Sequence, residues 1–303
     1  MTTDSVAPTP LEQERAAEEL EATGNFRVLR RLLSRSQYAI DDGSAKKIGI
    51  VLDVETTGLD TATDEIIELG MVKFEFATDG RIFRILDRFD ELQEPSIPIS
   101  MEITALTGIT AGDVAGKAID PVAVEAFVED AAVVIAHNAG FDRKFCERFW
   151  PGFVHKGWAC SVTQIDWRAE GFEGSRLGYL LSGCGLFHDG HRAQTDCEAL
   201  LEILSRPLPK SGEPALKRLL DVARRTSARI WAENSPFDMK DVLKGRGYRW
   251  NDGSDGRPKA WWHDVPEDER ETEFTFLRDE IYLRDVEPNW SRISTFERFS
   301  TRG

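Results

Sequence analysis

Cysteine is scarce in this chain, and the few cysteines it has are far apart. The 303 residues include four of them, with no Cys-x-x-Cys pair and no histidine beside them at zinc-finger spacing. That pattern matches neither a zinc site nor the dense framework of small disulfide-bonded domains. We expect all four to be reduced and buried: Cys146, Cys160, Cys184 and Cys197.

Positive charge and long apolar runs are scarce as well. Lys and Arg total 38 against 53 Asp and Glu, and the net charge of −15 argues against broad electrostatic adhesion to DNA or membranes. Enzymes whose metal ions and local basic patches handle phosphates are not excluded. No run approaches the ~20 apolar residues of a membrane span, and residues 1–13 lack the order of a signal peptide. We expect a cytoplasmic protein with no membrane partner.

The material for a folded core is present. Hydrophobic residues make up 41% of the chain and charged residues 30%, as in soluble globular proteins. Residues 11–20 and 26–33 are candidate amphipathic helices, serving either as a lead-in or as a docking arm. Composition divides the chain into an N-terminal helical or flexible extension (1–45), a main domain (46–206), a Pro-rich linker (207–213) and a small C-terminal α+β module with a ragged tail (214–303).

The main domain opens with an apolar stretch, Ile48–Leu59, that is typical of a buried central strand. Asp53 and Glu55 lie near its carboxyl end, and side chains two residues apart on a strand point to the same face. Side by side, the two acids would raise each other's pKa unless a cation intervened, and Mg²⁺ takes oxygen ligands of this kind. A pair of solvated acids at a strand end is the competing interpretation.

The rest of the main domain predicts a mixed α/β sheet. Residues 65–76 and 81–89 are expected to form an antiparallel hairpin around an Asp-Gly turn. A short buried strand over 131–136 and a strand within 154–165 follow, with helices between and after them. The sequence therefore predicts an α/β fold with a five-stranded sheet flanked by helices.

Two further acids and a histidine lie later in this domain. Asp142 follows the short strand, and Asp196 lies one turn into a helix, five residues after His191. Each of these acids alone is more often a cap or a solvated charge. Together with Asp53 and Glu55 they make up the set of acids found in a two-metal phosphoryl-transfer site, in which the two ions lie about 3.5–4 Å apart. His191 is the candidate for accepting the proton of the attacking water.

The chain resembles the DnaQ-like 3′–5′ exonucleases of the DEDD superfamily, in its histidine-containing branch, like the proofreading epsilon-type exonucleases of DNA polymerase III. The resemblance covers 46–206 and rests on three blocks in the family's order: residues 53–59 (Asp-Val-Glu-Thr-Thr-Gly-Leu), 137–142 (His-Asn-Ala-Gly-Phe-Asp) and 191–196 (His-Arg-Ala-Gln-Thr-Asp). Position 192, where the other branch has tyrosine, is Arg. The resemblance implies an RNase H-like sheet.

The resemblance also implies a role for each residue of these blocks. Two Mg²⁺ or Mn²⁺ ions are held by Asp53, Glu55, Asp142 and Asp196, and His191 is the general base. Turn amides can meet a 3′-hydroxyl, and apolar side chains offer a surface to the base or sugar. The residues implied to grip the terminal nucleotide are Thr56, Thr57, Gly58, Leu59, Asn138 and Phe141.

The remaining histidines and the C-terminal module are less specific. His137 is expected to order the loop beside Asn138, and the other three histidines, His155, His188 and His263, match no pattern. In the module, basic residues interleave with aromatic ones, which is the composition either of a single-strand-binding surface or of a small aromatic core. These residues are Lys240, Lys244, Arg246, Tyr248, Arg249, Trp250, Arg257, Lys259, Trp261 and Trp262.

The sequence thus predicts a metal-dependent 3′–5′ exonuclease of proofreading or repair type that releases nucleoside 5′-monophosphates from DNA. Its expected partners are a nucleic acid 3′ end and, as a further candidate, a DNA polymerase. An exoribonuclease of the same fold remains open, because recognition of the 2′-hydroxyl is not fixed by these motifs. A non-catalytic polymerase-accessory module and an RNase H-like endonuclease also remain open as alternatives. The complete set of four acids and a histidine counts against the accessory module.

Overall fold

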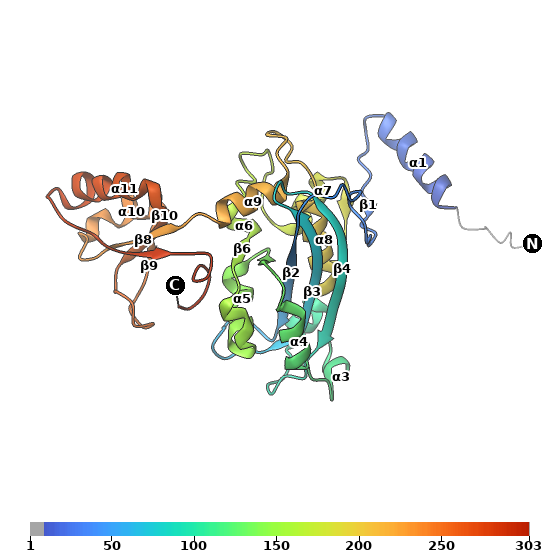
Figure 1. Cartoon of the computed structure of the whole chain (residues 1–303), viewed down its shortest axis with the longest axis horizontal. Coiled ribbons are helices and arrows are strands. Elements are labelled where there is room, and N and C mark those ends of the chain that lie inside the picture. The colour runs from blue at the N-terminus through green and yellow to red at the C-terminus, as the bar shows by residue number, and fades with distance from the viewer. Residues whose placement is uncertain (1–8, 303) are drawn as a thin grey trace, which may run out of the picture.

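The computed structural model describes residues 9–302, and residues 1–8 of the predicted N-terminal extension, together with Gly303, lie outside that range. A five-stranded sheet in the order β4-β3-β2-β5-β6 forms the centre of the main domain (Figure 1). Strands β2, β3 and β4 are antiparallel, whereas β2, β5 and β6 run parallel. Their bounds are β2 Lys46–Thr56, β3 Ile66–Ala77, β4 Ile82–Leu92, β5 Val133–Ala136 and β6 Trp158–Cys160.

Strand β2 is buried on both faces, as its apolar run predicted. Val51 packs with helix α8 (Ala193–Leu204) in one core cluster, and Ile50 and Leu52 pack in another with α5 (Ala139–Phe149). Burial of each such side chain is worth about 1.5–3 kcal/mol. Because side chains alternate along a strand, Asp53 and Glu55 share the parity of Val51 and face α8.

The predicted hairpin is confirmed. Strands β3 and β4 pair from Glu68–Leu92 to Phe76–Ile82, and the turn between them closes with a hydrogen bond from the Gly80 amide to the Ala77 carbonyl. Gly80 has a φ of +88°, in the left-handed region that favours glycine. The expected fold class is likewise confirmed, with helices on both faces of the sheet. The other helices of the main domain are α2 Met101–Thr107, α3 Ala111–Val114, α4 Pro121–Val128, α6 Ser161–Gln164 and α7 Leu177–Gly183. Helix α9 (Ala215–Ala223) lies in the range expected for the C-terminal module, but its apolar side chains pack in the core of the main domain.

The N-terminal extension contains one of the two predicted helices. Helix α1 (Pro10–Ala22) starts at a capping box made by Thr9 and Glu12. Residues 26–33 are not helical, which corrects the second prediction. Their strand β1 (Arg30–Arg31) pairs in parallel with β7 (Leu186–Phe187), so the backbone groups of this segment bond to a distant strand rather than to one another.

The C-terminal module is a second, smaller α+β unit, drawn on the left of Figure 1. Its four-stranded antiparallel sheet has the order β11-β8-β10-β9, and its core includes the buried Tyr248 and the partly buried Trp261. The core interpretation therefore holds for these two aromatic residues. The elements of the module are β8 Ser227–Ala232, α10 Lys240–Gly245, β9 Arg249–Trp250, β10 Trp261–Pro266, α11 Arg270–Phe276, a π-helix Leu277–Tyr282 and β11 Asn289–Ile293, with 3₁₀ turns at Phe237–Met239 and Glu267–Glu269. A further 3₁₀ turn, Pro151–His155, follows α5 in the main domain.

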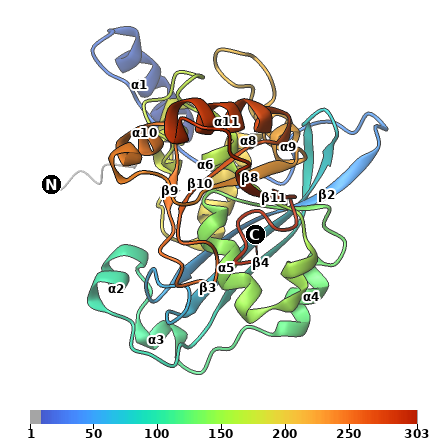
Figure 2. The same ribbon diagram turned by 90° about the vertical axis from the view of Figure 1, so that its left-hand side faces the viewer.

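The predicted ragged tail is wrong. After β11, residues 294–302 return to the main domain and lie beside α5 (Figure 2). The fully buried guanidinium of Arg143 donates to the carbonyl oxygens of Phe296 and Arg298 at 2.6 and 2.8 Å, and it pairs with Glu147 at 2.7 Å. Because a buried charge is costly without partners, these contacts fix the tail against α5. No helix among residues 9–302 is long and apolar enough to cross a membrane.

Candidate active site

Three carboxyls converge where β2 ends beneath the first turn of α8. Oxygens of Asp53, Glu55 and Asp196 all lie within 4.8 Å of one another. The convergence follows from the fold, because Asp53 and Glu55 project from the face of β2 on which α8 packs. Asp142 lies in the first turn of α5, which follows the carboxyl end of the neighbouring parallel strand β5. Helix α5 begins at Ala139 and therefore includes this acid.

Burial disfavours the charged forms of Asp53, Glu55 and Asp142, and neighbouring acids add to this effect at Asp53 and Glu55. Burial and the neighbouring acids raise the pKa of Asp53 well above its usual value, and burial together with Asp196 raises the pKa of Glu55 to about 8. Burial also raises the pKa of Asp142 to about 7. Hard oxygen ligands that repel one another fit a divalent cation, which would relieve the repulsion. The donor set therefore suits a divalent metal site.

A fifth acid, Glu68, holds α8 in place. It lies opposite Glu55 in the β2–β3 register and is fully buried. Its carboxylate accepts hydrogen bonds from the Arg192 guanidinium at 2.6 Å and from the Ala193 amide at 2.8 Å. It thereby satisfies one of the amide groups left unbonded at the start of α8. Glu68 went unnoticed in the sequence, since its role depends on the strand register.

Glycine at position 70 lets α8 approach the sheet. A Cβ added to Gly70 would lie 2.4 Å from the carbonyl carbon of Ala193, a distance that real Cβ atoms do not show. One turn further along the helix the contact is again close, because the thiol of Cys197 lies 3.3 Å from the Gly70 carbonyl oxygen. Only glycine therefore allows the helix to bring Asp196 to the end of β2.

The two histidines of the loop before α8 have different surroundings. His191 has a φ of +65° and is exposed, and it bonds to none of the four carboxyls among the described residues. His188, which was given no role, places its Nε2 2.8 Å from Oδ1 of Asp196. The second oxygen of Asp196 accepts from the Arg192 amide at 3.1 Å. The only signal that could have singled out His188 is its position in the same loop as His191.

The turn after β2 is tied together by its own side chains. The Thr56 hydroxyl donates to the Gly58 carbonyl, and the Thr57 hydroxyl bonds to Asp64. A Cβ on Gly58 would lie 2.5 Å from the carboxylate of Asp64. These threonines therefore shape the turn, while Leu59, which is 84% exposed, remains accessible to a ligand.

The block around α5 supplies the other predicted nucleotide contacts. Asn138 is exposed at the start of the helix, and Phe141 is half-buried with its ring 4.9 Å from that of Phe145. His137 bonds to the Ser161 hydroxyl at 2.7 Å and to the Ser175 carbonyl at 2.6 Å. The expectation that His137 orders this loop is confirmed by these contacts.

Comparison with known proteins identifies the family. The sequence profile of the family described as Exonuclease matches residues 50–204, which is just over half of the chain. The chain belongs to the exonuclease family. The predicted likeness to DnaQ-like 3′–5′ exonucleases is thus confirmed, and the mixed sheet of this exonuclease is the RNase H-like sheet that the likeness implied.

Relatives of this exonuclease include bacterial proteins named DNA polymerase III PolC-type. The protein from Thermotoga maritima is 38% identical over 214 residues, which cover 65% of this chain and 14% of that protein. The one from Caldanaerobacter subterraneus is 31% identical over 228 residues, which cover 68% of this chain and 15% of that protein. The exonuclease therefore matches only about a seventh of the length of these relatives.

Solved structures similar to the exonuclease include a zinc-bound complex of E. coli ExoI with single-stranded DNA. It has a TM-score of 0.49 and 13% identity, and the match covers 83% of this chain and 66% of that one. Exonuclease X in complex with 5′ overhanging duplex DNA has a TM-score of 0.40 and 24% identity, over 56% of this chain and 99% of that one.

Proposed function

We propose that this exonuclease removes nucleotides one at a time from the 3′ end of DNA. The observation that carries the proposal is the convergence of the Asp53, Glu55 and Asp196 oxygens within 4.8 Å at the carboxyl end of the central strand. Clustered acids are of little use to a protein that only binds a polyanion, because they repel phosphate. They suit a site in which cations and phosphate bind together.

In the proposed reaction, water attacks the phosphorus of the last phosphodiester. A bond forms between the water oxygen and phosphorus, and the bond from phosphorus to the 3′-oxygen of the preceding nucleotide breaks. The leaving oxygen takes up a proton, and a nucleoside 5′-monophosphate departs. Two Mg²⁺ or Mn²⁺ ions, when bound, would activate the water and stabilise the leaving oxygen.

The residues of this chain divide the remaining tasks. The metal ligands are Asp53, Glu55, Asp142 and Asp196, and His191, which is exposed, accepts the proton of the water. The residues that hold the terminal nucleotide are the turn 56–59, Asn138 and Phe141. Leu59 is the exposed apolar side chain of that set, and contact with an apolar face suits an enzyme that accepts any base.

The preference for DNA is supported by the relatives, which are named DNA polymerases. The same likeness makes a DNA polymerase the further candidate partner. The direct test uses 5′-labelled single-stranded DNA and matched RNA, each with Mg²⁺ or Mn²⁺ and with or without a chelator. We expect a DNA ladder that shortens from the 3′ end and disappears with the chelator. Internal cuts would indicate an endonuclease, faster trimming of RNA an exoribonuclease, and absence of cleavage would overturn the proposal.

A further inference from the structure

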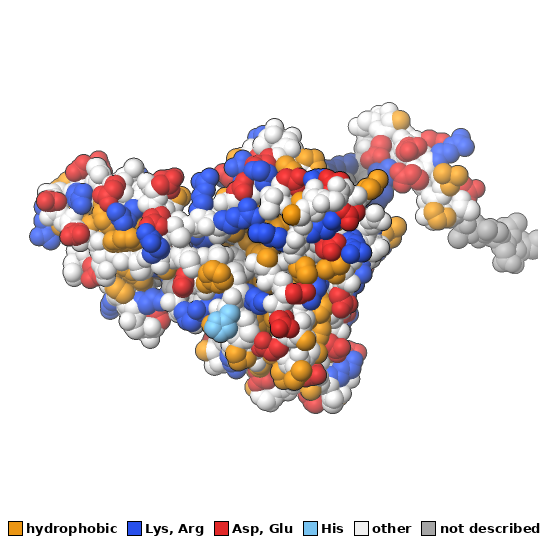
Figure 3. Space-filling view, viewed as in Figure 1, with side chains coloured by type: hydrophobic (Ala, Val, Ile, Leu, Met, Phe, Trp, Pro, Cys, Tyr) orange, Lys and Arg blue, Asp and Glu red, His pale blue; other side chains and the backbone are white. Residues whose placement is uncertain are grey.

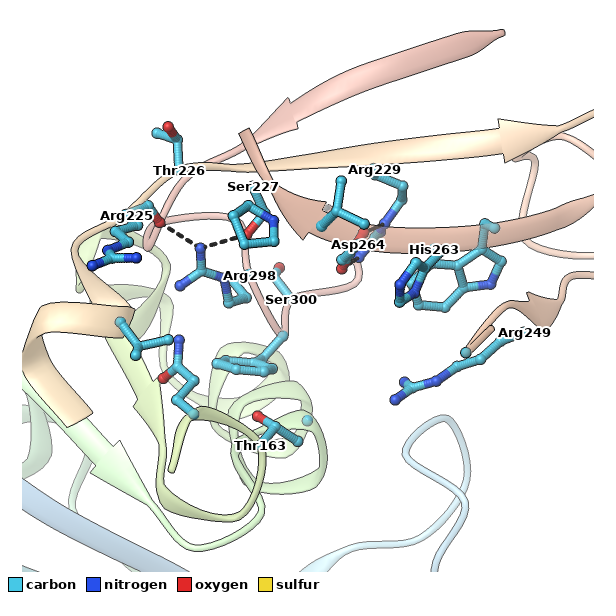
Figure 4. A pocket seen from close by; sticks show the side chains of 18 of the residues that line it. Thr163, Arg225, Thr226, Ser227, Arg229, Arg249, His263, Asp264, Arg298 and Ser300 are labelled. Carbon is cyan, nitrogen blue, oxygen red and sulfur yellow. Dashed lines mark hydrogen bonds and ion pairs between the residues drawn. The ribbon is translucent and has the colours of Figure 1, made fainter. Parts of the chain in front are cut away.

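A basic cavity lies between the main domain and the C-terminal module. It has a volume of about 700 Å³ and is bounded by α5 and α6 on one side and by β8, β10 and the tail on the other (Figure 4). Among the described residues that line it, Asp264 is the one acid, and the cations are Lys144, Arg225, Arg229, Arg249, Arg257 and Arg298. A chain with a net charge of −15 therefore concentrates positive charge at this place.

Three of these cations have no anionic partner that would hold them there. Lys144, Arg225 and Arg249 form no ion pair or side-chain hydrogen bond among the described residues, and Arg225 and Arg249 are exposed. Figure 4 shows Arg249 reaching into the space from the module, opposite Thr163 of the main domain. In the space-filling view, Lys and Arg side chains gather where the module joins the main domain (Figure 3). Unpaired like charges facing one space repel one another, so this arrangement favours an anionic ligand.

The wall of the cavity also contains an aromatic ring and a buried amide nitrogen without a partner among the described residues. Trp262 is half-buried on β10, with the guanidinium of Arg229 4.3 Å above its ring and that of Arg249 5.6 Å away. Arg229 is itself fixed by Asp264 through two contacts of 2.7 Å. The buried amide nitrogen of Gln164 has no hydrogen-bond partner among the described residues. Cations that interleave with an aromatic ring are typical of surfaces that bind single-stranded nucleic acid.

Helix α5 connects this cavity with the acidic cluster. Gly140 and Lys144 line the cavity, whereas Asp142, two residues from each, lies on the opposite side of the same helix. A Cβ on Gly140 would meet nothing within 4 Å, so the helix surface is open at that point. The width of a helix is about 10 Å, which an extended strand of nucleic acid crosses within a few nucleotides.

We propose that this cavity, which we call the interdomain cleft, binds the sugar-phosphate backbone of the single strand that leads to the 3′ end in the active site. The inference rests on the proposed function, because that function supplies the strand. Lys144, Arg225 and Arg249 contact phosphates, and the ring of Trp262 supports the guanidinium of Arg249 beside them. The C-terminal module thus extends the substrate site beyond the terminal nucleotide, and long substrates bind more tightly than short ones.

The test compares two triple charge reversals in the full chain. The cleft variant is Lys144→Glu/Arg225→Glu/Arg249→Glu. The matched control, Lys240→Glu/Lys244→Glu/Lys259→Glu, makes the same charge change at module residues outside the cleft. The dissociation constant of a labelled single strand of about 15 nucleotides is measured by anisotropy in EDTA over a range of salt concentrations. Hydrolysis of the p-nitrophenyl ester of thymidine 5′-monophosphate reports on the active site alone.

We expect the cleft variant to weaken binding of the single strand at least about tenfold and to lower the salt slope by about 2, since each lost phosphate contact removes about 0.7. The control variant should bind as the unchanged protein does. Ester hydrolysis should stay within about twofold in both variants, which also shows that they are folded. Equal losses in the two variants, or no loss in either, would overturn the cleft proposal. Failure of the unchanged protein to hydrolyse both DNA and the ester would instead overturn the proposed function.

Discussion

His188 lies 2.8 Å from Asp196 through its Nε2 atom, while His191 remains exposed in the same loop. The two histidines are therefore suited to different tasks. His188 orients a carboxyl of the acidic cluster, and groups that orient metal ligands in this way commonly affect metal affinity by about 10–100-fold. In the proposed reaction, the exposed His191 meets the attacking water.

Replacing each histidine by alanine should separate these tasks. We expect His188→Ala to raise the Mg²⁺ concentration needed for half-maximal activity by about tenfold or more. His191→Ala should leave that concentration unchanged and lower kcat by about 10²–10⁴-fold, the usual contribution of a general base. Metal titrations of the nuclease rate provide the measurement. If the two variants exchanged these effects, His188 would be the base.

Asp142→Asn tests the acid that α5 contributes. The substitution keeps the shape of the side chain and removes its charge, so we expect the rate to fall by at least about hundredfold. The melting temperature in the absence of metal should not fall, because the buried Asp142 has a pKa raised to about 7 and asparagine has no charge to desolvate. Near-normal activity would remove Asp142 from the site.

The stability of the metal-free protein should depend on pH in an unusual direction. Glu55 has a pKa of about 8 in the folded state against an ordinary value of 4.5, so the folded state binds its proton more tightly than the unfolded state. The contribution of this group to stability is complete below pH 4.5 and is lost as the pH rises through 8. We expect the melting temperature in EDTA to fall between about pH 5 and pH 8.

A divalent cation should reverse this effect. Because Mg²⁺ or Mn²⁺ binds the charged carboxylates, the rise in melting temperature on adding metal should be larger at about pH 8 than at about pH 5. The control is Glu55→Gln, in which the fall with pH should become shallower. An equal effect of metal at both pH values would contradict this account of the cluster.

Gly70→Ala tests the close approach of α8 to β3. The added Cβ would collide with the backbone of Ala193, so the helix must move and carry Asp196 with it. We expect the folded protein to lose at least about tenfold in kcat, since small displacements of catalytic groups are costly. The control is Gly112→Ala, whose Cβ would meet nothing closer than 3.6 Å. Full activity of Gly70→Ala would show that α8 adjusts without moving its acid.

Patterns that repeat within a strand or helix could be predicted from the sequence. The strands of the main sheet and the convergence of Asp53, Glu55 and Asp196 followed from side-chain alternation and the three blocks. Features that depend on distant partners could not. Residues 26–33 have helical periodicity, yet their backbone pairs with Leu186 and Phe187. The contact of His188 likewise depends on the loop conformation around His191.

The tail has a consequence for the order in which the protein is made. Thr295 bonds to the backbone of Trp158, a residue that precedes it by 137 positions, and the same segment supplies the carbonyl groups that satisfy Arg143 on the helix of Asp142. When the ribosome has completed the main domain, the tail segment that packs against this domain has not yet been synthesised. The nascent catalytic domain must wait for the whole C-terminal module before α5 receives its last partners, so shortened translation products should yield an exonuclease of lower stability.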